Sequence, residues 1–266
     1  MCSNPRLAFL LATLALPLFA TEPATTSSPW DQTALGLFKD AHVAFAQQPA
    51  SSDREARFGE AVTLISLQPK TDANLDRAAS LFGAIVTANA TDDLGISSRY
   101  YLARIPQIHR ATPDTVAALT GFRELAALES SHPLAQRAVV QVALIELFEP
   151  RLPASEIRAR YDRLASRGAA LTESSAIRDF NLVMGDAVLR FSLGDSLALD
   201  HLLAADRAGI ARAITRRDTW LRIAELGRRT GRNDVAKTYY AKFLDAFPRD
   251  SRRLTVKERL AALPAQ

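Results

Sequence analysis

Residues 219–250 read TWLRIAELGRRTGRNDVAKTYYAKFLDAFPRD, and this stretch decides the fold. Two segments with helical periodicity flank a turn that contains Gly231, and Pro248 ends the second segment. Small residues at Ala224 and Ala236 allow two antiparallel helices to approach closely. The stretch therefore predicts a tightly packed helical hairpin.

Aromatic side chains fill the remaining inward positions of this hairpin. Trp220, Tyr240 and Phe243 are placed to occupy the groove between the two helices. The spacing resembles the tetratricopeptide repeat (TPR), whose pattern runs Trp-x2-Leu-Gly-x2-Tyr, then Ala-x3-Phe, then Pro. In this chain the pattern is met by Trp220, Ile223 for Leu, Ala224 for Gly, Gly227 for the first Tyr, Ala236, Tyr240 for Phe, and Pro248. The resemblance implies hairpins that stack on one another.

The small-x3-large spacing of the second helix recurs along the chain. Its anchors are Ala41, Ala78, Gly121, Ile157, Ala198 and Ala236, which by subtraction lie 37, 43, 36, 41 and 38 residues apart. Stacked helical hairpins produce such a regular spacing. The alternative is an alanine-rich helical protein in which a loose pattern recurs by chance.

Composition agrees with an all-helical chain. The protein has 266 residues, of which 48% are hydrophobic, and only 11 are glycine. No stretch alternates apolar and polar residues as a half-buried strand does. We predict an all-α fold of about twelve helices, a right-handed solenoid of stacked antiparallel TPR-like hairpins over residues 30–266.

The N-terminus has the features of a secretory signal. Arg6 precedes an apolar run over residues 7–19, and cleavage after Ala20 would remove residues 1–20. The run is shorter than the roughly 20 apolar residues of a membrane-spanning helix, so no stable span is expected after cleavage. Residues 21–29 are predicted to be a flexible leader, with Ser28 and Pro29 starting the first helix. The sequence thus indicates an exported, periplasmic or secreted protein.

Residues that could act as catalysts or metal ligands do not form a recognisable motif in the sequence. The four histidines, His42, His109, His132 and His201, are not at metal-ligand spacing, and Cys2 is the only cysteine. No phosphate loop, dinucleotide fingerprint or nucleophile elbow occurs. We therefore predict no catalytic residue, no metal and no cofactor.

One segment, residues 99–110, combines aromatic and basic residues. Tyr100 and Arg104 are four apart and share a helix face. The TPR resemblance implies that this face lines the concave groove in which such proteins bind peptides. Alternatively, the tyrosines pack in the core and Arg104 is solvated.

Charge is distributed unevenly. Residues 21–150 contain 10 Lys and Arg against 15 Asp and Glu, a net charge of −5, whereas residues 201–266 contain 15 against 7, a net charge of +8. A basic end favours an acidic protein or peptide partner, with Arg228 and Arg252 as candidate contacts. Nucleic acid is not expected as a partner of an exported protein.

The helix before Gly231 is expected to contribute to the same surface. The resemblance implies that Asp218, Leu221, Glu225 and Arg228 face the concave groove. Arg222 and Arg229 flank Glu225 at helical spacing, and we expect them to pair with it. The remaining positive charge is then too large to be neutralised locally.

These features favour an exported, non-enzymatic protein–protein interaction module or scaffold of a bacterial cell envelope. The location in the envelope rests on fold-level analogy. Two alternatives remain open at this stage. One is an enzyme that acts on envelope polymers, and the other is a structural subunit that self-associates through its oppositely charged ends.

The hairpin interpretation predicts that Tyr240 and Trp220 are buried against one another. Tyr240→Ala should lower the free energy of unfolding by roughly 3–5 kcal/mol, the usual cost of removing a large aromatic side chain from a core. Chemical denaturation measures this loss. A loss below about 1 kcal/mol would contradict the repeat alignment at this position.

Overall fold

The computed structural model describes residues 28–48, 54–148 and 153–264, and within these ranges the chain is helical and has no strand. The helices are α1 (Pro29–Ala34), α2 (Phe38–Ala46), α3 (Arg54–Ser66), α4 (Asp72–Ala88), α5 (Asp93–Arg104), the π-helix η1 (Ile105–His109), α6 (Thr115–Ala126), α7 (Pro133–Phe148), α8 (Ala154–Gly168), α9 (Ser174–Arg190), α10 (Asp195–Ala208), α11 (Ala213–Arg229), α12 (Asn233–Ala246) and α13 (Arg253–Ala261). The all-α prediction is confirmed. The predicted signal peptide and residues 21–27 of the predicted leader lie outside the described ranges.

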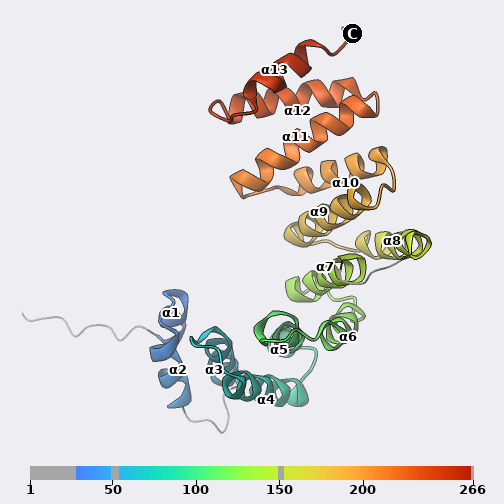
Figure 1. Cartoon of the computed structure of the whole chain (residues 1–266). Helices are drawn as coiled ribbons and strands as arrows, with labels where there is room; N and C mark the ends of the chain where they lie inside the picture. Colours follow the sequence, from blue (N-terminus) through green and yellow to red (C-terminus); the bar gives the residue numbers. More distant parts are fainter. Residues whose placement is uncertain (1–27, 49–53, 149–152, 265–266) are drawn as a thin grey trace, which may run out of the picture.

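The helices pair in chain order, and the pairs stack into a curved solenoid (Figure 1). In each of the pairs α3–α4, α5–α6 and α7–α8, the first helix lies toward the inner side of the curve and the second toward the outer side. The first helices also contact one another, α3 with α5, α5 with α7 and α7 with α9. The fold is therefore a TPR-like α-solenoid whose inner face is built from first helices.

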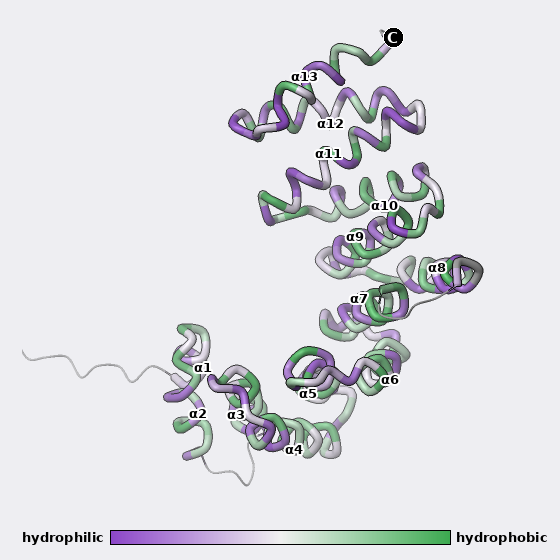
Figure 2. Tube along the Cα trace, in the orientation of Figure 1, coloured by the Kyte–Doolittle hydropathy of each residue, from purple (hydrophilic) through white to green (hydrophobic). Residues whose placement is uncertain are grey.

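The six predicted anchors occupy equivalent places in this stack. Each lies in the second helix of its pair: Ala41 in α2, Ala78 in α4, Gly121 in α6, Ile157 in α8, Ala198 in α10 and Ala236 in α12. The large residue four positions later is buried in every case, from Phe45 at 3% exposure to Tyr240 at 0%. Figure 2 shows the apolar positions where neighbouring helices face each other. The predicted repeat register is confirmed.

Close helix approach depends on residues without a bulky side chain. A Cβ atom added at Gly227 in α11 would lie 3.0 Å from the backbone nitrogen of Ala236 and 3.1 Å from the carbonyl oxygen of Arg232. At the crossing of α5 and α6, a Cβ at Gly121 would lie 3.0 Å from the Cβ of Ala103. These contacts are tighter than most packed side chains make, so a larger residue at either glycine would force the neighbouring atoms to move.

Polar contacts connect successive pairs with the period of the repeat. Side-chain hydrogen bonds join Arg54 to Asp92, Gln107 to Gln141, Gln136 to Thr172, Asp186 to Arg222 and Asp218 to Arg252, at sequence separations of 38, 34, 36, 36 and 34 residues. These separations of 34–38 residues are close to the anchor spacing of 36–43, because equivalent helices of neighbouring pairs lie side by side. We call this set the inter-repeat ladder.

The first predicted helix is divided in two. Ser28 caps α1 with a capping box that includes Asp31, and Pro29 is the first helical residue, as predicted. The chain then leaves the helix at Gly36, which adopts a φ of +78°. Only glycine adopts this backbone conformation readily. The sequence predicts that the helix starting at Pro29 continues through Phe38 and Phe45, but the described residues contain α1 and α2 instead.

The aromatic contacts of the last hairpin differ from the prediction. Tyr240 is fully buried, but Trp220 is only partly buried. The ring contacts of Trp220 are with Tyr239, at a centroid distance of 6.5 Å, and with Phe247, at 6.0 Å. The predicted pairing of Trp220 with Tyr240 is wrong. The neighbouring residue Tyr239 faces Trp220, whereas Tyr240 points to a different side of α12 and its hydroxyl donates to Glu225.

Crossing a membrane requires a long helix of apolar residues, and no helix in the described ranges meets both conditions.

Two glycine substitutions test the close-packing argument. Gly227→Ala should destabilise the protein by about 1–3 kcal/mol, because the added methyl group meets backbone atoms that cannot move alone. Gly83→Ala, in the middle of α4, is the matched control, since a Cβ there has nothing within 4 Å. It should stabilise the protein by roughly 0.5–1 kcal/mol through lower backbone entropy in the unfolded chain. Urea unfolding of both variants measures the change in the free energy of unfolding. A change of the same sign in both variants would contradict the prediction.

Candidate partner-binding surface

The inner face of the solenoid carries two adjoining hollows that share Arg137. The first is ≈ 420 Å³ and is lined by α3, α5, η1 and α7, and the second is ≈ 370 Å³ and is lined by α7, α9, the turn after α10, and α11. All lining residues come from first helices and the turns at their ends. We call the two hollows together the concave groove. Its polar residues are Ser66, Tyr100, Tyr101, Arg104, His109, Arg137, Gln141, Arg178, Asp179, Arg212 and Thr215.

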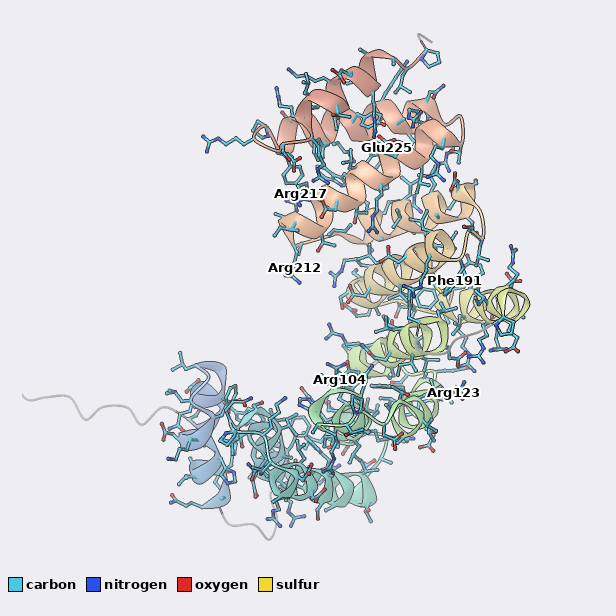
Figure 3. All side chains as sticks on the ribbon, viewed as in Figure 1. Arg104, Arg123, Phe191, Arg212, Arg217 and Glu225 are labelled. Atoms are coloured by element: carbon cyan, nitrogen blue, oxygen red, sulfur yellow. The ribbon has the colours of Figure 1, made fainter. Side chains whose placement is uncertain are left out.

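Tyr100 and Arg104, predicted from sequence, both line the first hollow. Tyr100 is 6% exposed, its ring contacts Tyr101 and Phe122, and burial raises its pKa. Tyr100 thus contributes mainly to the core and presents only an edge to the groove. Arg104 lies on the inner side of the solenoid, as Figure 3 shows. Their role in binding stays a prediction.

Hydrogen bonds hold Arg104 in position. Its Nη1 donates to Oε1 of Gln107 at 2.7 Å, and Nε2 of Gln107 donates to Oε1 of Gln141 at 2.9 Å. No carboxylate of the described residues lies within ion-pair distance of Arg104. The guanidinium is therefore fixed in place while its charge is left unbalanced.

The second hollow has the same excess of positive charge. Asp179 is the one carboxylate among the lining residues that the structure describes. It lies 2.8 Å from Arg178 and 3.9 Å from Arg137, while Arg212 is exposed and has no ion-pair partner in the described ranges. Four arginines thus share one acidic side chain along the groove. Such a surface attracts carboxylates.

His109 does not add to this charge at neutral pH. Nζ of Lys70 lies 2.9 Å from its Nδ1. Burial, together with the charges of Lys70 and Arg104, lowers the pKa of His109 to about 4. The ring is therefore neutral and serves as a hydrogen-bonding group in the wall of the groove.

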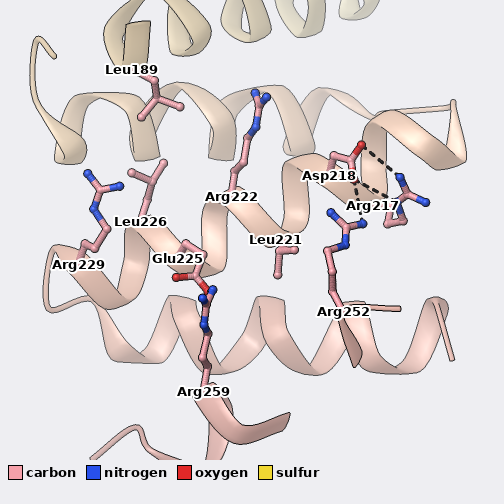
Figure 4. Close-up of a pocket in the computed structure, with 10 residues that line it drawn as sticks. All are labelled: Leu189, Arg217, Asp218, Leu221, Arg222, Glu225, Leu226, Arg229, Arg252 and Arg259. Atoms are coloured by element: carbon pink, nitrogen blue, oxygen red, sulfur yellow. Dashed lines mark hydrogen bonds and ion pairs between the residues drawn. The ribbon is translucent and has the colours of Figure 1, made fainter. Parts of the chain in front are cut away.

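A further hollow of ≈ 500 Å³ lies at the C-terminal end, between α9, α11 and the α13 segment (Figure 4). Asp218, Leu221 and Glu225, for which the resemblance implies the concave groove, line this C-terminal hollow, and Arg228 is not among its lining residues. Arg228 instead pairs with Glu225 at 3.2 Å. Arg252 lines the hollow and donates to Asp250 at 2.9 Å and to Asp218 at 3.0 Å.

The arginines of this C-terminal hollow are already neutralised within the chain. Arg222 pairs with Asp186 and Arg229 with Asp195, both in the preceding pair of helices. The expectation that both pair with Glu225 is wrong, because the inter-repeat ladder brings closer carboxylates to them. Arg217 binds Asp218 and Asp250, and Arg259 binds Glu225. Each arginine that lines the hollow thus has a carboxylate partner in the chain, but only Asp186 and Asp195 come from outside residues 201–266, so most of the net charge of +8 remains.

Sequence reasoning missed Arg137, Arg178 and Arg212 as groove residues. Arg104, Arg137 and Arg178 lie in the first helices α5, α7 and α9, so one arginine recurs in each successive pair. This recurrence was visible in the sequence. Its significance depends on which neighbouring carboxylates fold against each arginine, and the sequence alone does not give that.

Two of the histidines, His201 and His132, take part in hydrogen bonds between neighbouring repeats. His201 bonds to the hydroxyl of Tyr161 at 2.5 Å and to Oδ1 of Asn181 at 2.8 Å, linking α8, α9 and α10. His132 lies 2.9 Å from Asp93. Within the described ranges, no group of three or more His, Cys, Asp or Glu side chains is arranged to hold a metal ion.

Asp250 provides a pH test of the C-terminal ion pairs. Its side chain is 6% exposed, and the hydrogen bonds from Arg252 lower its pKa to about 2. Because this folded-state pKa is depressed, the stabilisation is present above pH 4 and is lost as pH falls toward 2. Asp250→Asn should lower the melting temperature at pH 7 and flatten its decline between pH 4 and 2.

The matched control is Asp245→Asn, in the same region but exposed and without an ion pair in the described part of the chain. This substitution should leave the decline of the melting temperature between pH 4 and 2 unchanged. If Asp250→Asn behaves like this control, the Arg252 cluster does not stabilise the fold.

Comparisons with known proteins add little to this geometry. No protein-family model and no curated protein matches the chain. Among solved structures, it is similar to a thermophilic TPR protein of Thermus thermophilus, with 19% sequence identity and a TM-score of 0.43. That match covers 79% of this chain and 98% of the other. The stacked hairpins and the regular anchors of this chain themselves show a TPR-like helical-repeat fold.

Proposed function

We propose that this protein is an exported, non-enzymatic interaction module or scaffold that binds an acidic segment of a partner protein in the concave groove. A curved inner face built from successive repeats is an extended binding surface. An extended segment running along the first helices would meet the side chains of Arg104, Arg137 and Arg212 in turn.

One observation carries this proposal, namely the unequal neutralisation of arginines along the inner face. Around the C-terminal hollow, Arg252 and its neighbours are paired with carboxylates of the chain. In the concave groove, four arginines face Asp179 alone. Carboxylates of a partner would supply the missing negative charge, and arginine binds them with two parallel hydrogen bonds.

Arg228 and Arg252 remain candidate contacts at the C-terminal end. A partner that contacts them has to share them with Glu225, Asp218 and Asp250. The groove is therefore the principal docking surface in this proposal, and the C-terminal end is a secondary one.

Export supports a location in the bacterial cell envelope. The basis is Arg6 followed by the apolar run of residues 7–19 and the small residue Ala20. An exported scaffold has no access to cytosolic nucleic acid, which leaves acidic proteins or peptides as the anionic partners of the groove.

Self-association is a second candidate function, and the N-terminal pair of helices favours it. Leu35, Leu37 and Val43 there are 72%, 47% and 48% exposed. An end-to-end contact between two copies would cover these apolar side chains and bring oppositely charged ends together. Sedimentation over a range of protein concentrations and salt separates this function from binding of a different partner.

The groove proposal predicts salt-sensitive binding that depends on Arg104 and Arg137. The partner is isolated with the tagged protein from an envelope extract, and its affinity is measured by titration. Arg104→Ala combined with Arg137→Ala should weaken binding at least about tenfold, corresponding to roughly 1.4 kcal/mol. Raising the salt from low to moderate concentration should slow association, because surface charges are screened beyond about 8 Å at physiological salt.

Two further variants locate the surface. Arg249→Ala with Lys257→Ala removes two exposed cations of the C-terminal end and should leave the affinity unchanged. Arg228→Glu with Arg252→Glu should weaken binding less than the groove variant does. If the affinity changes neither with salt concentration nor in the variant with Arg104→Ala and Arg137→Ala, the concave groove is ruled out as the docking surface.

A further inference from the structure

The concave groove carries apolar side chains beside its arginines. Ile108 lines the first hollow together with Arg104 and is 50% exposed. Leu182 lines the second hollow together with Arg178 and is half-buried. Exposed apolar side chains that are scattered singly are normal, but a group of them along one groove marks an interaction site. Positive charge is therefore only part of what the groove presents to a partner.

Helix α7 adds a third apolar side chain to this face. Leu144 is 39% exposed, whereas Ala143 and Ile145 on either side of it are buried. It follows Arg137 by seven residues and Gln141 by three, so these three side chains share one face of the helix. Because Arg137 and Gln141 line the first hollow, Leu144 continues the inner face of α7 beyond that hollow.

Two contacts align these residues across neighbouring first helices. Between η1 and α7, Nε2 of Gln107 donates to Oε1 of Gln141 at 2.9 Å. Each glutamine lies in sequence between the arginine and the exposed apolar residue of its own repeat. Between α7 and α9, Arg137 lies 3.9 Å from Asp179, the residue after Arg178. The arginines therefore lie at one level of the stacked helices, and the apolar residues lie further along each helix.

We call these two sets the arginine row (Arg104, Arg137 and Arg178) and the apolar row (Ile108, Leu144 and Leu182). The rows are about 5–10 Å apart along the helices, because each apolar residue follows its arginine by four or seven residues. Among the groove-lining residues that the structure describes, Asp179 is the one carboxylate, and it contacts the arginine row. The groove thus has one cationic edge and one apolar edge.

We propose that the partner segment bound in the concave groove is extended and alternates acidic with bulky apolar residues. Successive side chains of an extended chain point to opposite sides. Alternation therefore turns the carboxylates toward the arginine row and the apolar side chains toward the apolar row. The net positive charge of the groove selects the acidic residues, and the exposed surface of Ile108 and Leu144 selects the apolar ones. This inference rests on the proposed function, since it specifies the partner of the same groove.

The test uses three labelled peptides with blocked ends, each eight residues long. The first alternates Asp with Leu, the second has the same residues as a block of Asp followed by a block of Leu, and the third alternates Asp with Ser. Fluorescence anisotropy at low salt measures the affinity of the full-length protein for each peptide. We expect the alternating Asp–Leu peptide to bind at least about tenfold more tightly than the other two, because only this peptide meets both rows.

The variant Ile108→Ser with Leu144→Ser tests the apolar row. Both side chains are exposed, so the fold should not change. The variant should bind the alternating Asp–Leu peptide about tenfold more weakly, at the level of the Asp–Ser peptide. Val116→Ser with Leu254→Ser is the matched control, because these side chains are 75% and 68% exposed and do not line the groove. It should leave all three affinities unchanged.

The variant Arg104→Ala with Arg137→Ala separates this inference from the groove function. It should weaken the binding of every Asp-containing peptide. If it does so while Ile108→Ser with Leu144→Ser has no effect, the groove function stands and the apolar row is rejected. If the arginine variant has no effect, or no peptide binds, the groove function is rejected together with this inference.

Two further results would overturn the proposal. Equal affinities for the alternating and the block peptide would show that the groove does not distinguish an acidic from an apolar edge. Dimerisation that rises with protein concentration and is abolished by Ile108→Ser with Leu144→Ser would identify a second copy of the chain as the occupant. Sedimentation of the wild type and of this variant measures that dimerisation.

Discussion

Close approach between paired helices is the constraint on which the rest of the structure depends. Where α11 meets α12, backbone lies against backbone at Gly227 and Ala236, and no side chain fits between them. At the crossing of α5 and α6, Gly121 lies against the methyl group of Ala103, so a small residue is needed there as well. Because these crossings are fixed, large residues such as Tyr240 and Phe122 are positioned to fill the space on either side. Each pair then presents a similar surface to the next, and the pairs can stack.

The stacking in turn decides how charge is distributed. Side chains about one repeat apart in sequence become neighbours, so carboxylates of one pair reach arginines of the next, as Asp186 reaches Arg222. This ladder gives arginines of the C-terminal hollow carboxylate partners within the chain, as it does for Arg222 and Arg252. It does not extend to Arg104 or Arg212, and the concave groove keeps an unbalanced positive charge. The electrostatic character of the inner face is thus a consequence of repeat register.

The irregular position of α8 has a different origin and a different consequence. Helix α7 buries apolar residues on several faces, including Val140, Val142 and Ile145, and packs against both α6 and α9. Helix α8 makes only a short contact with α7. The buried carboxylate of Glu146 in α7 forms ion pairs with Arg163 of α8 and Arg123 of α6. The solenoid therefore has a continuous inner face and an interrupted outer face.

The sequence by itself determined the helical class, the repeat register and the position of the close crossings. These features depend on local periodicity and on the small residue at each anchor, for example Ala78 and Ala198, which act within a single hairpin. For Tyr100 and Arg104 the sequence left the groove face and the core as open alternatives, and in the structure both residues line a hollow while Tyr100 is buried. Only the tertiary structure decided that Trp220 contacts Tyr239 and Phe247, and that the partners of Arg222 and Arg229 lie in the preceding pair. Those contacts depend on the twist between helices far apart in sequence, which determines which side chains meet and which charges remain unpaired.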